Sequence, residues 1–108
     1  MIHSVNKSEQ FTLIKLRGTL EIGKQAKLKE DLLKQIYPGS SKVILDFKAV
    51  EFIDSACLGI LISLTRKLRE QGGDMCLANL QEDVHSIFQI TRLDKIFKIY
   101  ENTEDAFK

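Results

Sequence analysis

Residues 43–62 read VILDFKAVEFIDSACLGILI and carry the most informative pattern of the chain. The run at residues 43–45 is apolar throughout, which is typical of a strand that is covered on both faces. After a short loop, Asp54 and Ser55 stand at the start of a very apolar helix that we expect over residues 55–71. A serine at a helix start can cap the helix, and the free N–H groups beside it can also hold a phosphate. The first interpretation makes Ser55 structural, and the second makes it a switch.

The rest of the chain alternates strands and helices around this unit. Gly18, Pro38-Gly39 and Gly72-Gly73 are expected to end the second strand, the first helix and the second helix. The expected strands are residues 2–6, 11–17, 43–45, 75–78 and 96–100, and the expected helices are residues 24–36, 55–71, 82–91 and 103–107, the last with Thr103 as its cap. This order, ββαβαβαβα, predicts an α/β fold with a mixed sheet. The strands after the first hairpin should be parallel and joined by right-handed crossovers.

Composition and charge indicate a soluble globular protein. The chain has 108 residues, of which 44% are apolar and 29% are charged, and its formal net charge is +1. We therefore expect a single domain over residues 1–108 and no nucleic-acid partner. The longest apolar run, residues 56–62, is too short to cross a bilayer, and no signal peptide is apparent. Cys57 and Cys76 lack metal-binding spacing, so we expect free thiols, a cytoplasmic location, no membrane insertion and no cofactor.

A helical wheel of residues 55–71 separates two faces. The stripe expected to face the sheet consists of Cys57, Leu61, Leu64 and Leu68, and the opposite stripe consists of Ser55, Gly59, Ile62 and Arg66, with Leu58 on its flank. The first two turns of the outer stripe offer a hydroxyl, a bare backbone at Gly59 and an apolar side chain at Ile62. This composition favours a surface that another protein approaches closely. We therefore predict that Leu58, Gly59 and Ile62 contact a partner.

Phosphorylation of Ser55 is compatible with the helix that it begins. A phosphoserine carries a charge of about −1.5 to −2 at neutral pH. A helix N-terminus tolerates negative charge, so the fold should survive the modification. An apolar partner surface would lose its complementarity to this charge, so binding should weaken.

On these residues the chain resembles the STAS domains of the bacterial anti-sigma-factor antagonist type. The resemblance covers nearly the whole chain. It rests on the element order, the turn at residues 17–21, the DFKAVEFIDS motif at residues 46–55, Leu58-Gly59 and the Gly72-Gly73 helix stop. It implies a four- to five-stranded mixed sheet with helices packed on one side.

The resemblance also implies a function in transcription regulation by partner switching. In this family an unphosphorylated antagonist binds an anti-sigma factor, which is a serine kinase, and so releases the sigma factor. The kinase then phosphorylates the antagonist and binding ends, and a PP2C-type phosphatase reverses the reaction. Ser55 matches the phosphorylated serine, Asp54 matches the acidic residue before it, and Glu21 lies where family members usually carry Asp. The resemblance therefore adds Asp54, Ser55 and Glu21 to the expected partner-binding residues.

The motif departs from the family pattern at three positions. The family commonly has Asp-Ser-Ser-Gly-Leu-Gly or Asp-Ser-Thr-Gly-Leu-Gly, and residues 54–59 here read DSACLG. Cys57 replaces a glycine and should face inward. Ala56 removes a second hydroxyl and leaves Ser55 as the only acceptor in the motif. Glu21 keeps the charge of Asp but places it one methylene further out.

Other functions fit the sequence less well. A serine nucleophile needs a base, and His3 and His85 fall outside the motif. Neither a Gly-x-Ser-x-Gly elbow nor a phosphate-binding glycine loop is present, so we do not expect an enzyme. A response-regulator receiver would need an acidic pair after its first strand, and this sequence has no such pair there. The remaining alternative is a STAS subunit of a lipid transporter or of a stress-signalling scaffold, which would bind its partner without switching.

Overall fold

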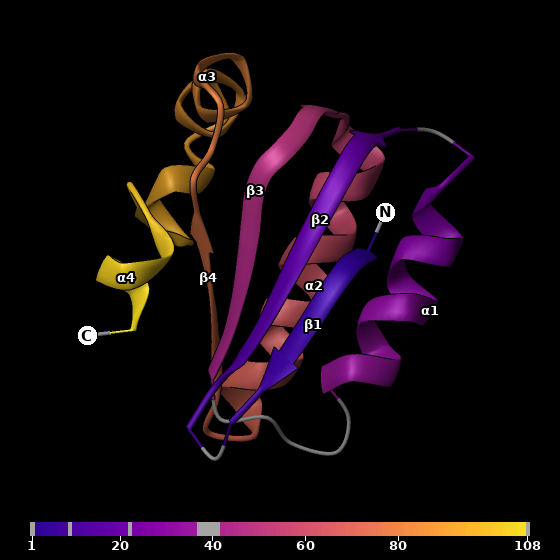
Figure 1. The fold of residues 1–108 in the computed structure, drawn as a ribbon. Helices are drawn as coiled ribbons and strands as arrows, with labels where there is room; N and C mark the ends of the chain where they lie inside the picture. Colours follow the sequence, from indigo (N-terminus) through magenta and orange to yellow (C-terminus); the bar gives the residue numbers. More distant parts are fainter. Residues whose placement is uncertain (1, 9, 22, 37–41, 108) are drawn as a thin grey trace.

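The computed structural model describes residues 2–8, 10–21, 23–36 and 42–107. Its elements alternate as the sequence predicts, with one additional 3₁₀ turn before the last strand (Figure 1). In chain order they are β1 (Ile2–Lys7), β2 (Thr12–Leu20), α1 (Gln25–Ile36), β3 (Lys42–Ile53), α2 (Ser55–Glu70), β4 (Asp74–Ala78), α3 (Glu82–Ile90), η1 (Leu93–Lys95), β5 (Lys98–Tyr100) and α4 (Thr103–Ala106). None of the helices in these ranges is long and apolar enough to span a bilayer.

The five strands form one mixed sheet in the order β1-β2-β3-β4-β5. The β1–β2 hairpin is antiparallel, and each later neighbouring pair is parallel. Because α1, α2 and α3 each connect two parallel strands, they cross over the sheet in the manner expected of βαβ units. The predicted α/β class with a mixed sheet is confirmed.

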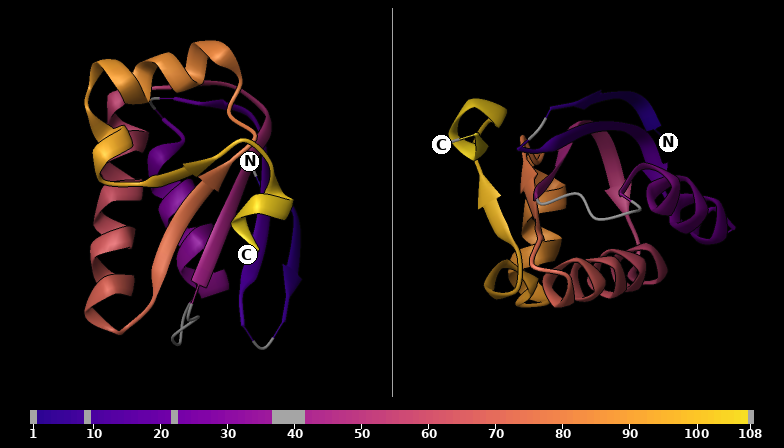
Figure 2. Two further views of the ribbon diagram at one scale, coloured as in Figure 1. Left: turned by 90° about the vertical axis from the view of Figure 1, so that its left-hand side faces the viewer. Right: turned by 90° about the horizontal axis from the view of Figure 1, so that it is seen from below.

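Two apolar clusters cover the two faces of the sheet. Successive residues of a strand point to opposite faces, and in β3 Val43 and Leu45 belong to the large cluster whereas Ile44 belongs to the small one. Helices α1, α2 and α3 contribute to the large cluster, and α4 contributes Ala106 to the small one. Figure 2 shows this arrangement, with three helices on one side of the sheet and α4 on the other. The predicted one-sided helix layer therefore describes the three crossover helices, and the short terminal helix covers the second face.

The inward stripe of α2 is confirmed. Its four predicted members are at most 2% exposed: Cys57, Leu61, Leu64 and Leu68. They meet the buried face of α1, which consists of Leu28, Leu32 and Ile36. The hydrophobic effect contributes about 1.5–3 kcal/mol for each fully buried side chain of this size, so this layer is a major source of stability.

Strand β3 is longer than the apolar run from which we predicted it. It extends to Ile53, so the expected short loop before α2 is part of the strand. Strand β4 ends at Ala78, opposite Asp46, and the second half of β3 therefore pairs with β2 alone. That half buries only Val50 and Ile53 among its last six residues. A strand with one neighbour and one covered face does not need a continuous apolar sequence, which is why the pattern missed it.

Gly18 was expected to end β2, but it lies inside this strand. Its φ is +91°, and the register with β3 shifts between Gly18 and Thr19. The shift marks a bulge whose extra residue, Glu51, lies in β3. On the opposite strand Gly18 adopts its positive φ without steric cost, because it has no Cβ. The bulge allows β2 to continue to Leu20, beside the end of β3.

Two predictions about the C-terminal region are also corrected. Strand β5 is limited to residues Lys98–Tyr100, because the residues before it form the η1 turn. Helix α4 is capped by Asn102, whose side chain accepts the N–H of Asp105 at 2.8 Å, and Thr103 is the first helical residue. The expected stop at Pro38-Gly39 lies outside the described residues.

The conformation of Gly18 yields a stability prediction. We expect Gly18→Ala to lower the free energy of unfolding by about 1–2 kcal/mol, because a Cβ is strained at this positive φ. Gly59 is the matched control: it is exposed inside α2, and a Cβ there would have no neighbour within 4 Å. Gly59→Ala should raise stability by about 0.5–1 kcal/mol through helix propensity. Equilibrium urea unfolding measures both, and a stabilising Gly18→Ala would contradict the positive φ at Gly18.

Candidate functional site

The candidate site lies where β2 and β3 end and α2 begins. Leu20 and Ile53 are paired at the ends of the two strands, and the N–H of Asp54 donates to the Leu20 carbonyl at 2.9 Å. The Cys57 Sγ lies 3.9 Å from the Glu21 carbonyl oxygen. The strand ends therefore bring Glu21 next to Asp54 and the first turn of α2, as the resemblance implies.

Asp54, and not Ser55, caps α2. The Asp54 backbone is extended, with φ −100° and ψ 177°, and its Oδ1 accepts the N–H of Cys57 at 3.0 Å. The interpretation of Ser55 as the cap is therefore wrong. Both residue types cap helices well, and they are adjacent in the sequence, so the pattern alone could not separate them.

Ser55 is the first residue of α2 and is exposed. Its hydroxyl makes no hydrogen bond to any residue in the described part of the chain. Because Asp54 already accepts the Cys57 N–H, capping of α2 does not depend on this hydroxyl. The side chain is chemically available from solvent.

The outer face of α2 is narrower than the helical wheel suggests. Gly59 is exposed as predicted. Leu58, by contrast, is only 5% exposed and belongs to the large apolar cluster, so the prediction that it lies on the exposed surface is wrong. Ile62 is half-buried against the same cluster, and its contact with a partner remains a prediction.

The position of Arg69 explains why the buried arc of α2 is wide. Arg69 lies two turns after Ile62 on the same side of the helix. Its guanidinium donates to the Ile96 carbonyl at 2.6 Å and to Asp74 at 2.8 Å. This side of α2 therefore faces the residues that follow η1. A helical wheel of one helix cannot predict such contacts with other segments.

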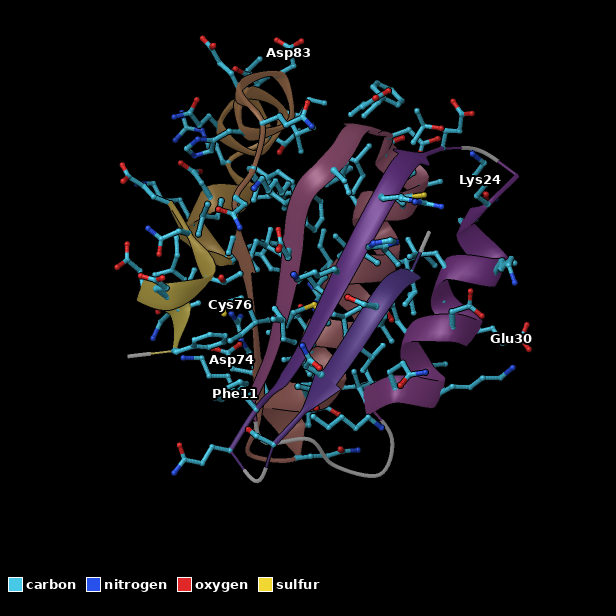
Figure 3. The ribbon with its side chains drawn as sticks, in the orientation of Figure 1. Phe11, Lys24, Glu30, Asp74, Cys76 and Asp83 are labelled. Atoms are coloured by element: carbon cyan, nitrogen blue, oxygen red, sulfur yellow. The ribbon has the colours of Figure 1, made fainter. Side chains whose placement is uncertain are left out.

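Two residues of the site escaped the sequence analysis. Lys24 lies at the start of α1, beside the end of β2 (Figure 3). Its Nζ lies 3.9 Å from Glu21 Oε1, 3.2 Å from Thr19 Oγ1 and 3.4 Å from the Thr19 carbonyl oxygen. Phe52 is 43% exposed near the end of β3, where its backbone is paired with that of Thr19. In the sequence Phe52 stands among the apolar residues Val50 and Ile53, so no local signal marks it as exposed.

The Cys57 thiol is protonated near neutral pH. Burial raises its pKa from 9.0 to about 11, the Asp54 and Glu21 carboxylates act in the same direction, and Lys24 opposes them. Burial likewise raises the pKa of Cys76 to about 11. Both thiols are free and buried. A buried, protonated thiol is a poor nucleophile, so these cysteines act as small packing residues.

The histidines lie outside this site. His3 is in β1 and lines a depression on the second face of the sheet, together with Lys15 and Asp46. His85 is on α3 and lines depressions near β5. Among residues 2–8, 10–21, 23–36 and 42–107, no cluster of His, Cys, Asp or Glu could hold a metal ion.

The cap assignment yields a direct test. We expect Asp54→Ala to lower the free energy of unfolding by about 1 kcal/mol, because the Cys57 N–H loses its acceptor. Ser55→Ala should stay within about 0.5 kcal/mol of the unsubstituted protein. Asp54→Asn retains an acceptor oxygen and serves as the control. If Ser55→Ala destabilised the protein as much as Asp54→Ala, Asp54 would not be the cap.

The raised thiol pKa values predict slow alkylation. The folded pKa of about 11 lies above the ordinary value of 9.0, so stability gained from the protonated thiol is present below pH 9 and lost as the pH rises from 9 to 11. At about pH 8, iodoacetamide should modify the native protein at least about 100-fold more slowly than the urea-unfolded chain, because the thiolate fraction is lower. In the Cys57→Ser variant, mass spectrometry measures the alkylation of Cys76 alone. Equal native and unfolded rates would contradict the assignment.

Comparison with known proteins identifies the family. The family model for the STAS domain matches residues 3–106. The anti-sigma-B factor antagonist of Bacillus subtilis is 28% identical over 100 residues, which cover 93% of this chain and 91% of that protein.

Solved structures agree in fold. A proposed anti-sigma factor antagonist from Thermotoga maritima matches with a TM-score of 0.89 and 25% identity, over 96% of this chain and 90% of that one. The antagonist SpoIIAA, solved in unphosphorylated and phosphorylated forms, matches with TM-scores of 0.78 and 0.70 at 21% and 20% identity. Each alignment covers 95% of this chain, with 91% and 95% of the respective SpoIIAA chains. With its β-strand order, its crossover helices and the match over residues 3–106, this chain belongs to the STAS domain family.

Proposed function

We propose that this protein is an anti-sigma-factor antagonist whose binding is switched off by phosphorylation of Ser55. The unphosphorylated form would bind an anti-sigma factor that is a serine kinase and so release a sigma factor. One observation carries the proposal: Ser55 is exposed at the start of α2 while Asp54 performs the structural role there. The names of the similar proteins support the general role.

Phosphorylation transfers the γ-phosphoryl group of ATP to Ser55. A bond forms between Ser55 Oγ and phosphorus, the bond from phosphorus to the β–γ bridging oxygen breaks, ADP leaves, and the hydroxyl proton is released. A PP2C-type phosphatase would reverse the state by adding water, which returns the hydroxyl and inorganic phosphate. Neither step requires a base from this chain, which agrees with a non-enzymatic role.

The switch would follow from charge added to the exposed face of α2 at its first turn. The phosphate would lie near Gly59, where no side chain separates a partner from the α2 backbone. A charge of about −2 placed against an apolar or close-packed partner surface is costly to desolvate. The N-terminus of α2 stabilises the same charge within the protein. Binding would therefore weaken while the fold persists.

The proposal is tested by the phosphorylation state in the cell. We expect the intact mass of the protein from its own cells to include a form with one phosphoryl group, and this form should be absent from Ser55→Ala. Ser63→Ala is the matched control, because Ser63 is also exposed on α2 and should not affect phosphorylation. Ser55→Asp should fold normally and bind the anti-sigma factor at least about 10-fold more weakly, a difference of about 1.4 kcal/mol.

Two outcomes would contradict the proposal. A phosphorylated form that persists in Ser55→Ala would place the modification elsewhere. The absence of any phosphorylated form during growth, starvation and stress would instead favour the non-switching subunit of a lipid transporter or a stress-signalling scaffold.

A further inference from the structure

Lys24 occupies a position that its own helix does not favour. The Lys24 carbonyl oxygen accepts the N–H of Leu28 at 2.9 Å, so Lys24 is the cap residue immediately before the first turn of α1. That turn has no acidic residue. Cations are unfavourable at a helix N-terminus because the helix dipole is positive there. The nearby Lys27 is compensated by Asp31 at 3.6 Å along the same helix, whereas Lys24 interacts with the end of β2.

The contacts of Lys24 place its charge at the end of the sheet that bears Ser55. Its Nζ is held by Thr19 Oγ1 at 3.2 Å, and Thr19 is paired with Phe52 of β3. One residue further along β2, the Leu20 carbonyl accepts the N–H of Asp54, which directly precedes Ser55. The electrostatic influence of Lys24 extends to Cys57 in the first turn of α2.

Carboxylates lie close to Ser55 along the chain and at the end of β2. Asp54 lies before it on the chain, Glu21 follows β2, and Glu51 is exposed on β3. Asp54 and Glu21 both act on the Cys57 thiol, and among the described residues Lys24 is the cation that opposes them. A phosphate dianion added to Ser55 would be repelled by these carboxylates, and nearby negative charge favours the singly charged form of the phosphate.

We infer that Lys24 is the charge partner of phosphorylated Ser55: its ammonium group turns from Glu21 towards the phosphoryl oxygens and holds the phosphate as a dianion. This inference rests on the proposed function, because it assigns a regulatory residue to the same site. Lys24 is well suited to the exchange, since its ion pair with Glu21 is long and about half exposed on both sides. Lys24 would be a positioning residue that sets the charge of the Ser55 phosphate near neutral pH.

The test uses protein that carries phosphoserine at position 55 by genetic incorporation, so that no kinase is needed. A ³¹P NMR titration then measures the second pKa of the phosphate, which is about 6 for an unperturbed phosphoserine. Lys24→Gln should raise this pKa by about 0.5 because an opposite charge is lost. Lys27→Gln removes the same charge from the same helix, but from a residue paired with Asp31, and should change it by less than about 0.2. Lys24→Arg should restore the original value.

Each outcome decides the inference. Equal shifts in Lys24→Gln and Lys27→Gln, or no shift in either, would show that Lys24 does not meet the phosphate. Circular dichroism and thermal melting of the unphosphorylated variants verify that they fold. The result is independent of the intact-mass experiment: that experiment can fail for want of a kinase while the NMR shift stands, and the shift can be absent while Ser55 is phosphorylated in the cell.

Discussion

The hydrogen bond from the Cys57 N–H to Asp54 Oδ1 is the interaction on which the site depends. It begins α2 immediately after β3 ends, and the bond from the Asp54 N–H to the Leu20 carbonyl ties the same residue to β2. Asp54 thus joins two strands and a helix. With the helix start fixed in this way, Ser55 must be the first helical residue, exposed and next to the N–H groups of the first turn.

Under the proposed function, this arrangement would separate structure from regulation between two adjacent residues. A serine that capped its own helix would lose a structural hydrogen bond when modified, and the modification would then disturb the fold. Here the carboxylate of Asp54 takes that role, and Asp54 also adds negative charge beside Ser55. The same residue that leaves the Ser55 hydroxyl without a capping role would therefore make a phosphate less favourable there, and this would be the electrostatic reason for the charge partner proposed at Lys24.

The sequence predicted the core better than the surface, for physical reasons that differ by element. The stripe of Cys57, Leu61 and Leu64 follows from the 3.6-residue period and needs no knowledge of neighbours. The burial of Leu58 in the large apolar cluster depends on neighbours outside α2, which no local pattern shows. The second half of β3 was missed because a strand with a single neighbour lacks a continuous apolar run.

Lys24 illustrates a different kind of limit on sequence reasoning. A lysine before a helix is unremarkable in a list of residues, and only its contacts with Thr19 and Glu21 place it at the site. Its position just before the first turn of α1 could nevertheless have drawn attention in the sequence. The helix dipole disfavours a cation there, and the first turn has no acidic residue that would compensate it. Local conflicts of this kind are informative where they fall close to a candidate site.

Gly59 presents the same kind of conflict on the neighbouring helix. A glycine inside a helix costs about 0.5–1 kcal/mol relative to alanine, and no neighbouring atom within 4 Å requires its small size. Nothing within the described fold therefore explains why this position lacks a side chain. A partner backbone that packs directly on the first turns of α2 would explain it, because a Cβ at this point would hold the two surfaces apart. The same close approach explains why a phosphate one turn earlier, at Ser55, would suffice to end binding without any change in the fold.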